Sequence, residues 1–419
     1  MKKRNLLWLA LALFGAACTM DTPDFETQDT PKEGNRYFVS VEEAIEKADQ
    51  FFALLDTTPG TRTQRVVKNI EMYKKGNPLT RSSNVTPEFY VINYVNDEGF
   101  ALMSTDSRKL PVYAFSTEGQ MYLADTTTNP GLRYYLNTAS TLPPVIGVGP
   151  TLPTDPGTPI DSIKYGELTI LVSPLLAPSV RNWDQFSLNK YVCPNPKDNI
   201  PVGCAALATA QIMSYFQWPL RWPVSADAFN KAKERYTFNW EEMIDTTVND
   251  EIARLVEILG RKENLNIDYK PLNSVAPNFG KNIKHTLDTM GYKAWFDRDM
   301  EFRFNSGIVL NTLYKKSPVL VGGKISGPED GHIWTVDGAA QYHQYYKDLY
   351  YLYYHCVWGQ GGKGNGYFYY DADSHSFSDK ASFKDKKDVG DGKSDGQYKD
   401  LNMVYEFIAK ISKIFKSDK

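Results

Sequence analysis

Hydrophobic and polar positions follow a helical period first and a strand-like pattern afterwards in the N-terminal part of this chain. Residues 40–55 carry apolar residues three and four positions apart behind a Ser-x-x-Glu capping box, which predicts an amphipathic helix. Residues 88–94, 100–104 and 112–115 are short apolar runs, and a polar Asn-Asp-Glu-Gly turn separates the first two. The pattern predicts a small α+β domain at residues 36–140.

A proline-rich segment separates this N-terminal region from a larger C-terminal region. Six prolines fall between residues 141 and 160. Their density excludes helix and central strand, and it predicts an exposed linker at 141–165, where peptidases can cut. In the C-terminal region, residues 166–410, the almost uniformly apolar or small residues 205–216 predict a buried helix. Residues 331–338 and 349–358 predict two strands. A short basic tail, residues 411–419, ends the chain.

The first residues of the chain predict export. Basic residues 2–4 precede a short apolar run that ends in Gly-Ala-Ala-Cys18, and such a run is too short to span a bilayer. Small residues before a cysteine are typical of bacterial lipoproteins, so we expect residues 1–18 to be a lipoprotein signal peptide and Cys18 to carry the lipid. An ordinary signal peptide cut nearby is the alternative. The polar residues 19–35 predict a tether, and the protein is expected outside the cytoplasm, anchored in the cell envelope.

Composition narrows the range of partners and raises the question of a free thiol. The formal net charge is −3, so the chain has no excess of basic residues to neutralise a run of phosphates, and we expect no nucleic acid partner. The chain has four cysteines. If Cys18 carries lipid, an odd number remains, which suggests a free and reactive thiol in an exported protein. A disulfide between Cys193 and Cys356 stays open at this point.

Cys204 is the candidate nucleophile. It stands at the first turn of the predicted buried helix, where unpaired backbone N–H groups and the helix dipole stabilise a thiolate. Gly203 before it allows other backbone to approach closely. The alternative is that Cys204 is one more small buried hydrophobic residue.

A thiolate nucleophile needs a general base, and the chain has five histidines. His332 opens the strand predicted at 331–338 and is the first candidate. His355 lies in the aromatic strand that would pair with it and is the second. The other three lie on a predicted helix or in polar loops and are weaker candidates: His285, His343 and His375.

Asp337 lies five residues beyond His332, and on a regular strand this odd spacing puts the two side chains on opposite faces. We therefore interpret Asp337 as a turn residue rather than as a partner of His332. The neighbours His355 and Cys356 also point to opposite faces of their strand. No group of His, Cys and acidic residues has the spacing of a zinc site, so we expect neither a metal nor a cofactor.

The segments around both candidates resemble one family of enzymes. Residues 203–219, Gly-Cys-Ala-Ala-Leu-Ala-Thr-Ala-Gln-Ile-Met-Ser-Tyr-Phe-Gln-Trp-Pro, are similar to the nucleophile segment of the streptopain family of cysteine peptidases. Residues 331–338 resemble the histidine segment of that family, and residues 358–368 resemble its glycine-rich segment. Residues 94–106 look like part of its inhibitory propeptide. The resemblance covers the chain from about residue 36 to about residue 408.

The resemblance implies a papain-like fold of two lobes, one helical and one built on an antiparallel sheet, behind a propeptide at 36–140. It implies that Cys204 attacks the substrate carbonyl and that His332 is the base. It implies that Gln185 helps bind the oxyanion and that Trp358 packs over the imidazole and shields it. Substrates would be polypeptides with hydrophobic side chains near the cut, and the propeptide would inhibit the peptidase until the linker is cleaved.

Two positions depart from the pattern of the family. Val357 stands where the family usually has an Asn that orients the catalytic imidazole, and Gln360 replaces a Trp. Because Val357 has no donor or acceptor, we expect another group to orient His332. The candidates are the amide oxygen of Gln360 and a backbone carbonyl of the glycine-rich segment.

The sequence therefore predicts a secreted, lipid-anchored zymogen of a cysteine endopeptidase. Two alternatives remain. The absence of Asn at Val357 suggests a catalytically weakened surface lipoprotein on a peptidase scaffold. A Cys–His pair also suits a cell-wall amidase or an acyltransferase.

Overall fold

The chain divides into two compact units, Met1–Phe38 and Val39–Lys419. The computed structural model describes residues 37–55, 65–75, 77–79, 86–142, 163, 166–277, 279–292, 294–296, 306–324, 331–345, 348–370 and 405–407. The predicted signal peptide, the tether, most of the linker and the basic tail lie outside these residues. No helix in the described part of the chain is long and apolar enough to cross a membrane.

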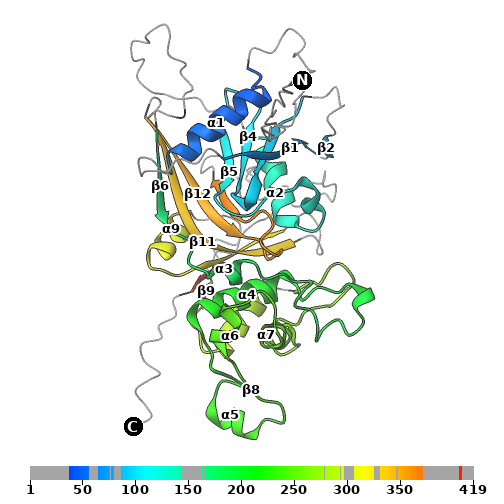
Figure 1. The fold of residues 1–419 in the computed structure, drawn as a ribbon. Helices are drawn as coiled ribbons and strands as arrows, with labels where there is room; N and C mark the ends of the chain where they lie inside the picture. Colours follow the sequence, from blue (N-terminus) through cyan, green and yellow to red (C-terminus); the bar gives the residue numbers. More distant parts are fainter. Residues whose placement is uncertain are drawn as a thin grey trace, which may run out of the picture. The chain divides into compact units, whose positions relative to one another are not determined.

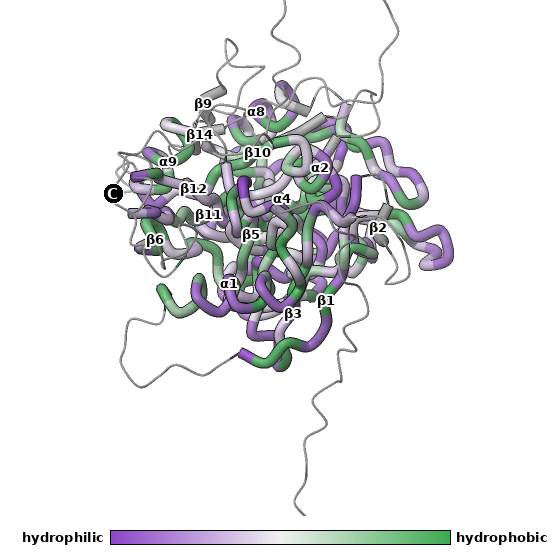
Figure 2. Tube along the Cα trace, turned by 90° about the horizontal axis from the view of Figure 1, so that it is seen from above, coloured by the Kyte–Doolittle hydropathy of each residue, from purple (hydrophilic) through white to green (hydrophobic). Residues whose placement is uncertain are grey.

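The N-terminal region has the α+β arrangement that its hydrophobic pattern predicts. Helix α1 (Val41–Ala53) begins at Ser40, whose hydroxyl accepts a hydrogen bond from the Glu43 N–H, and its apolar face is buried. Figure 2 shows the hydrophilic positions of α1 interleaved with hydrophobic ones. The remaining elements of this region are β1 (Val67–Lys74), β2 (Asn77–Leu79), β3 (Phe89–Tyr94), β4 (Phe100–Ser104), β5 (Val112–Ser116) and α2 (Pro130–Ala139).

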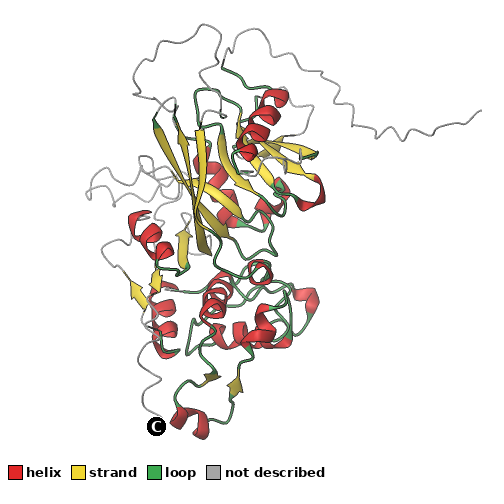
Figure 3. Cartoon of the chain, turned by 60° about the vertical axis from the view of Figure 1, so that its left-hand side comes forward, coloured by secondary structure: helices red, strands yellow, loops and turns green. Residues whose placement is uncertain are grey.

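The C-terminal region combines antiparallel strands with a cluster of helices, so the α+β class is confirmed. Figure 3 shows the helices of this region gathered beside the sheet. Its strands are β6 (Gly166–Val172), β7 (Arg221–Trp222), β8 (Tyr236–Thr237), β9 (Ala294–Phe296), β10 (Val319–Lys324), β11 (Gly331–Gln344), β12 (Leu349–Val357), β13 (Gly366–Tyr370) and β14 (Tyr405–Phe407). Its helices are α3 (Pro178–Arg181), α4 (Cys204–Phe216), α5 (Ala226–Lys231), α6 (Trp240–Ile244), α7 (Asp250–Gly260), α8 (Phe279–Thr289) and α9 (Ser306–Tyr314).

One antiparallel sheet joins the two regions. Within the described residues its strand order is β2-β1-β3-β4-β5-β13-β12-β11-β10-β14-β9, and β6 also pairs with β11 (Figure 1). The junction is the pairing of β5 with β13, where Phe115 faces Tyr367 and Ala114 faces Phe368. The hydroxyl of Tyr135 on α2 adds a bond across the junction, because it donates to the carbonyl of Tyr369 at 3.2 Å. The sequence pattern gave no sign of this shared sheet, because strand pairing across the linker is a non-local contact.

Helix α4 lies at the centre of the helical cluster, as its apolar composition predicts. It packs against β11 on one side and α7 on the other, and ten of its thirteen residues are buried. Two polar side chains fix its position. The Gln211 amide donates to the carbonyl of Val180 at 3.0 Å, and its oxygen accepts from the Thr335 hydroxyl on β11 at 3.3 Å. These bonds hold the helix that begins at Cys204 against the strand that begins beside His332.

Candidate active site

Cys204 is the first residue of α4, as predicted. Gly203 before it has a φ of +89°, and a Cβ at that position would lie 3.1 Å from the Ile267 side chain, so a glycine is needed there. Cys204 is half-buried, and its sulfur is in hydrogen-bond contact with the backbone N–H groups of Ile333 on β11, of Ala205 and of Cys204 itself, which lower the pKa of the thiol. Two segments more than a hundred residues apart in sequence therefore meet at this sulfur.

Two effects act on the pKa of the Cys204 thiol in opposite directions. Burial raises the pKa of the Cys204 thiol above its ordinary value, and the three backbone N–H groups only partly offset this effect. The helix N-terminus is present as expected, but desolvation of the sulfur outweighs it. Cys204 is accordingly a neutral thiol near pH 7 in this structure.

His332 lies at the start of β11 and is only 4% exposed. Its Nε2 is 3.0 Å from the carbonyl oxygen of Trp358. Burial lowers the pKa of His332 to about 4, and the hydrogen bond to Trp358 raises it slightly against that effect. The imidazole is thus neutral near pH 7, and a carbonyl partner requires the proton to be on Nε2. In the described residues no hydrogen bond joins this imidazole to the Cys204 thiol.

The residue that covers His332 comes from the N-terminal region. A Cβ on Gly131 of α2 would lie 2.7 Å from His332 Cδ2 and equally close to the indole of Trp358. Gly131 is helical, so it is needed here for close approach and not for an unusual backbone angle. Sequence reasoning missed Gly131, because a single glycine in a helix carries no signal of the partner it touches.

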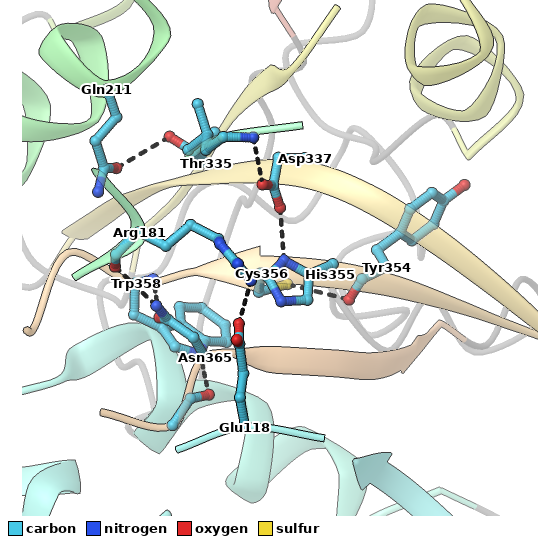
Figure 4. A network of polar contacts seen from close by, with 12 residues as sticks. Glu118, Arg181, Gln211, Thr335, Asp337, Tyr354, His355, Cys356, Trp358 and Asn365 are labelled. Atoms are coloured by element: carbon cyan, nitrogen blue, oxygen red, sulfur yellow. Dashed lines mark hydrogen bonds and ion pairs between the residues drawn. The ribbon is translucent and has the colours of Figure 1, made fainter. Parts of the chain in front are cut away.

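Trp358 packs beside the imidazole, as the resemblance implies. The two ring centroids are 6.4 Å apart, and the indole is also 5.1 Å from that of Trp334. The Trp358 backbone N–H donates to Asn365 Oδ1 at 3.0 Å, and its indole N–H donates to the carbonyl of Gly364 at 3.0 Å. Figure 4 shows Asn365 beside Trp358. Sequence reasoning missed Asn365, although it stands in the glycine-rich segment that the resemblance singles out.

A main-chain hydrogen bond holds Gln185 close to the start of α4. Its carbonyl accepts a hydrogen bond from the Val202 N–H at 2.9 Å, two residues before Cys204. The side chain is 7% exposed. Its neighbour Asp184 forms an antiparallel bridge with Gln360, so the glycine-rich segment runs beside Gln185. The three segments that carry Gln185, Cys204 and Trp358 therefore come together.

The group in contact with His332 is a backbone carbonyl and not Gln360. Val357 is fully buried in the hydrophobic core around α4. Gln360 is 3% exposed, and its Nε2 has no hydrogen-bond partner among the described residues. Of the two orienting groups considered from the sequence, the carbonyl of Trp358 is the one that the imidazole meets.

The interpretation of Asp337 as a turn residue is wrong. Asp337 lies within β11 and is buried, and its Oδ1 is 2.5 Å from His355 Nδ1 (Figure 4). The register of β11 with β12 shifts between Val336 and Gly338, so a bulge falls at Asp337 and the alternation of faces restarts there. His355 is therefore paired with Asp337 in the core, and it is not placed as an alternative base for Cys204.

The described cysteines are all free. Cys193, Cys204 and Cys356 form no disulfide, so the bridge between Cys193 and Cys356 is absent. Burial raises the pKa of the Cys356 thiol well above its ordinary value, which makes it inert. Cys18 lies outside the described residues. No cluster of three or more His, Cys, Asp or Glu side chains that could hold a metal occurs in the described part of the chain.

Comparisons with known proteins identify two regions of this chain. Residues 183–368 match the model of the Peptidase C10 family, and residues 36–141 match that of the Spi protease inhibitor. No curated protein matches the sequence. A solved fragment of prointerpain A from Prevotella intermedia is similar to 72% of this chain, over 91% of its own length, with 21% identity and a TM-score of 0.44. Active interpain A from the same organism is similar to 47% of this chain, over 85% of its own length, with 24% identity and a TM-score of 0.35.

Proposed function

We propose that this chain is the zymogen of a cysteine peptidase, with Cys204 as its nucleophile and His332 as its general base. The proposal is supported by the match of residues 183–368 to the Peptidase C10 family and of residues 36–141 to the Spi protease inhibitor. The observation that carries this proposal is the meeting of two segments. The Cys204 thiol at the start of α4 lies against the Ile333 N–H, one residue from His332. The streptopain resemblance in the sequence supports the same pair.

The reaction is amide hydrolysis through an acyl-enzyme. The Cys204 sulfur bonds to the carbonyl carbon of the scissile peptide, and its proton passes to Nδ1 of His332. Charge that develops on the carbonyl oxygen is stabilised by the Gln185 amide and by the backbone N–H of Cys204. The C–N bond then breaks as His332 returns the proton to the leaving amine. A water activated by His332 cleaves the thioester and releases the acid product.

Burial explains why the precursor is latent. The pKa of Cys204 is raised and the pKa of His332 is lowered to about 4, so both groups are neutral near pH 7. Attack needs a thiolate beside an imidazolium, and a buried site disfavours both charges. Because Gly131 of α2 lies directly against His332 and Trp358, departure of α2 admits water to the site. Access of water then favours the charged pair.

The substrates proposed are internal peptide bonds of unfolded polypeptides with hydrophobic side chains near the cut. The full-length protein should activate and then cleave denatured casein, and Cys204→Ala should abolish this cleavage. Cys193→Ser and Cys356→Ser are the matched controls, because neither thiol is joined to the site, and each should keep most of the activity. Casein cleavage by Cys204→Ala would contradict the role of Cys204 as nucleophile. Cleavage of muropeptides in place of casein would indicate a cell-wall amidase.

Export and a lipid anchor at Cys18 form the cellular part of the proposal. They are supported by the basic, apolar and small-residue order of residues 1–18. In a bacterial host fed labelled fatty acid, the full-length protein should incorporate label and fractionate with membranes. Cys18→Ser should lose the label. A labelled Cys18→Ser protein, or an unlabelled wild-type protein cut at another residue, would contradict the anchor.

A further inference from the structure

We propose that Asn365 is a positioning residue of the active site. Through the main chain of Trp358 it supplies the orientation of His332 that the apolar side chain of Val357 cannot supply. This inference rests on the proposed roles of Cys204 and His332. Asn365 touches neither of them, and it acts by fixing Trp358.

Position 357 offers His332 nothing to bind. The Val357 side chain is apolar and fully buried, and it packs in the core around α4 with Ile333. Gln360 also fails to serve, because the described residues give its Nε2 no partner and the imidazole contacts another group. The only polar atom of the chain that the structure shows bonded to the His332 ring, within the described residues, is the carbonyl oxygen of Trp358 at 3.0 Å.

That contact determines which nitrogen of His332 can act as a base. A carbonyl oxygen only accepts, so the Nε2 that faces it must carry the proton. Nδ1 of the neutral ring is then unprotonated and can take the proton of the Cys204 thiol. The tautomer needed for catalysis therefore depends on where the Trp358 carbonyl points.

Asn365 holds Trp358 in place. Its Oδ1 accepts from the Trp358 N–H at 3.0 Å, and its Nδ2 donates to the carbonyl of Arg181, the last residue of α3, at 2.8 Å (Figure 4). Its own N–H donates to the Gly362 carbonyl at 3.2 Å. Asn365 is thus fixed at three points and is 9% exposed.

The residue after Trp358 shows why such a restraint is needed. Gly359 has a φ of +74°, and three more glycines with positive φ follow at positions 361, 362 and 364. Glycines restrict their own backbone little, so the peptide that carries the Trp358 carbonyl is joined to a segment with wide conformational freedom. The bond from Asn365 to the Trp358 N–H, together with the indole bond to Gly364, restrains the residue from its other side.

The test compares Asn365→Ala and Asn365→Asp with Asn264→Ala. Asn264 is the matched control, because it is also buried and donates to a carbonyl near a helix end, Ile258 of α7 at 2.7 Å, away from the site. Each full-length variant is activated by trypsin treatment that is continued until the N-terminal fragment is degraded, and a serine peptidase inhibitor then stops the trypsin. We expect Asn365→Ala to lower kcat for a fluorogenic peptide by about five- to tenfold with little change in KM. Asn365→Asp keeps the acceptor for Trp358 but loses the donor to the Arg181 carbonyl, so its loss of kcat should be smaller than that of Asn365→Ala, and Asn264→Ala should match the wild type.

A second measurement separates positioning from loss of structure. The rate at which iodoacetamide alkylates Cys204 reports the thiolate, and it needs no substrate. In Asn365→Ala the pH at which this rate is half-maximal should rise above that of the wild type, because a misoriented imidazole accepts the thiol proton less well. The double variant Val357→Asn/Asn365→Ala should regain part of the lost kcat, since Asn at position 357 supplies an acceptor of its own.

The proposal is overturned if Asn365→Ala has the wild-type kcat and alkylation profile, or if Asn264→Ala loses as much activity. A wild-type enzyme that cleaves no peptide would refute the proposed function instead. The alkylation profiles of Asn365→Ala and wild type would still decide whether Asn365 positions the imidazole.

Discussion

At the scale of single residues, two protonation states distinguish this precursor from an enzyme ready to react. His332, which the sequence offers as the base, is buried in the structure as a neutral imidazole, and the half-buried Cys204 carries a neutral thiol. Residue type already favours the neutral form of both groups near pH 7. Burial strengthens that preference, because it raises the pKa of the thiol and lowers that of the imidazole.

The depressed pKa of His332 predicts that the precursor loses stability in acid. In the unfolded chain this histidine takes up a proton near its ordinary pKa of 6.5, whereas in the folded chain it stays neutral down to about 4. The unfolded state therefore binds more protons between these values, and the stability of the fold falls as pH falls through that window. By pH 5 the loss should be about 2 kcal/mol relative to pH 7.

Urea unfolding of full-length Cys204→Ala at the two pH values measures this loss, since the substitution removes both processing and any thiolate partner. The matched control is Cys204→Ala/His332→Asn, which lacks the titrating group. The acid-dependent loss should be smaller in the double variant by the amount assigned to His332. Equal losses in the two proteins would show that other groups cause the acid sensitivity.

At the scale of elements, helix α2 and strand β11 carry the contacts that decide whether the site is closed. Helix α2 brings Gly131 against His332, and Leu132 beside it lies near Gly364 of the glycine-rich segment. An ion pair also joins the two regions, between Arg181 at the end of α3 and Glu118, which precedes α2 (Figure 4). Close packing makes the helix sensitive to added volume at one position.

Gly131→Val should weaken latency. The first added carbon would lie 2.7 Å from His332 and Trp358, so α2 must shift away from the site. Iodoacetamide should then label Cys204 in the full-length protein about fivefold faster or more than in the wild type. Thr138→Val is the control, because it changes a half-buried residue of the same helix at nearly constant volume. Labelling of Gly131→Val at the wild-type rate would mean that α2 does not limit access to the thiol.

The bulge in β11 predicts a strong dependence of stability on Asp337. The carboxylate contacts His355 at 2.5 Å and also accepts from the Leu176 N–H at 3.1 Å, all in the interior. Asp337→Asn leaves one acceptor oxygen for two buried partners, the His355 ring nitrogen and the Leu176 N–H, and should lower the free energy of unfolding by about 3 kcal/mol.

The same β11–β12 hairpin supplies an exposed counterpart as a control. His343 Nε2 lies 3.0 Å from Asp348, whose side chain is 74% exposed. Asp348→Asn should change the free energy of unfolding by less than about 1 kcal/mol, because water screens an exposed pair. Urea denaturation compares the two. Similar costs at both sites would contradict the importance assigned to the buried pair.

At the scale of the whole molecule, the propeptide is part of the sheet of the peptidase. Strand β5 pairs with β13, and Tyr135 donates to the Tyr369 carbonyl across the same junction. The Tyr353 hydroxyl on β12 also donates to the Val112 carbonyl at 2.8 Å. These contacts do not depend on the linker, so its cleavage alone leaves them intact.

Cleavage in the linker should therefore yield a complex that stays together. Full-length Cys204→Ala, cut between residues 141 and 165 by an added protease, should elute from a sizing column as one species that contains both fragments. The wild-type chain should gain full activity only when the N-terminal fragment is degraded or removed. Separate elution of the two fragments of Cys204→Ala would show that the shared sheet does not hold the propeptide.

The sequence by itself determined the features that depend on neighbours along the chain. The Ser40 N-cap and apolar spacing of α1, the buried character of α4 and the placement of Cys204 at its first turn are confirmed, because helix periodicity and end signals are local. The family was identified in the same way, from short motifs around Cys204 and His332 that the family comparison confirms. Contiguous residues are enough for each of these conclusions.

Only the tertiary structure decided the features that depend on contacts between distant segments. Asp337 meets His355 because a bulge restarts the alternation of β11, which no count along the sequence reveals. Burial lowers the pKa of His332, and one residue packed against it is Gly131, about two hundred positions earlier in the chain. The carbonyl of Trp358 accepts the hydrogen bond from His332 that the Val357 side chain cannot accept. A backbone carbonyl can accept wherever the fold brings it near a donor. Burial and non-local pairing set these properties, and neither is encoded in any single stretch of residues.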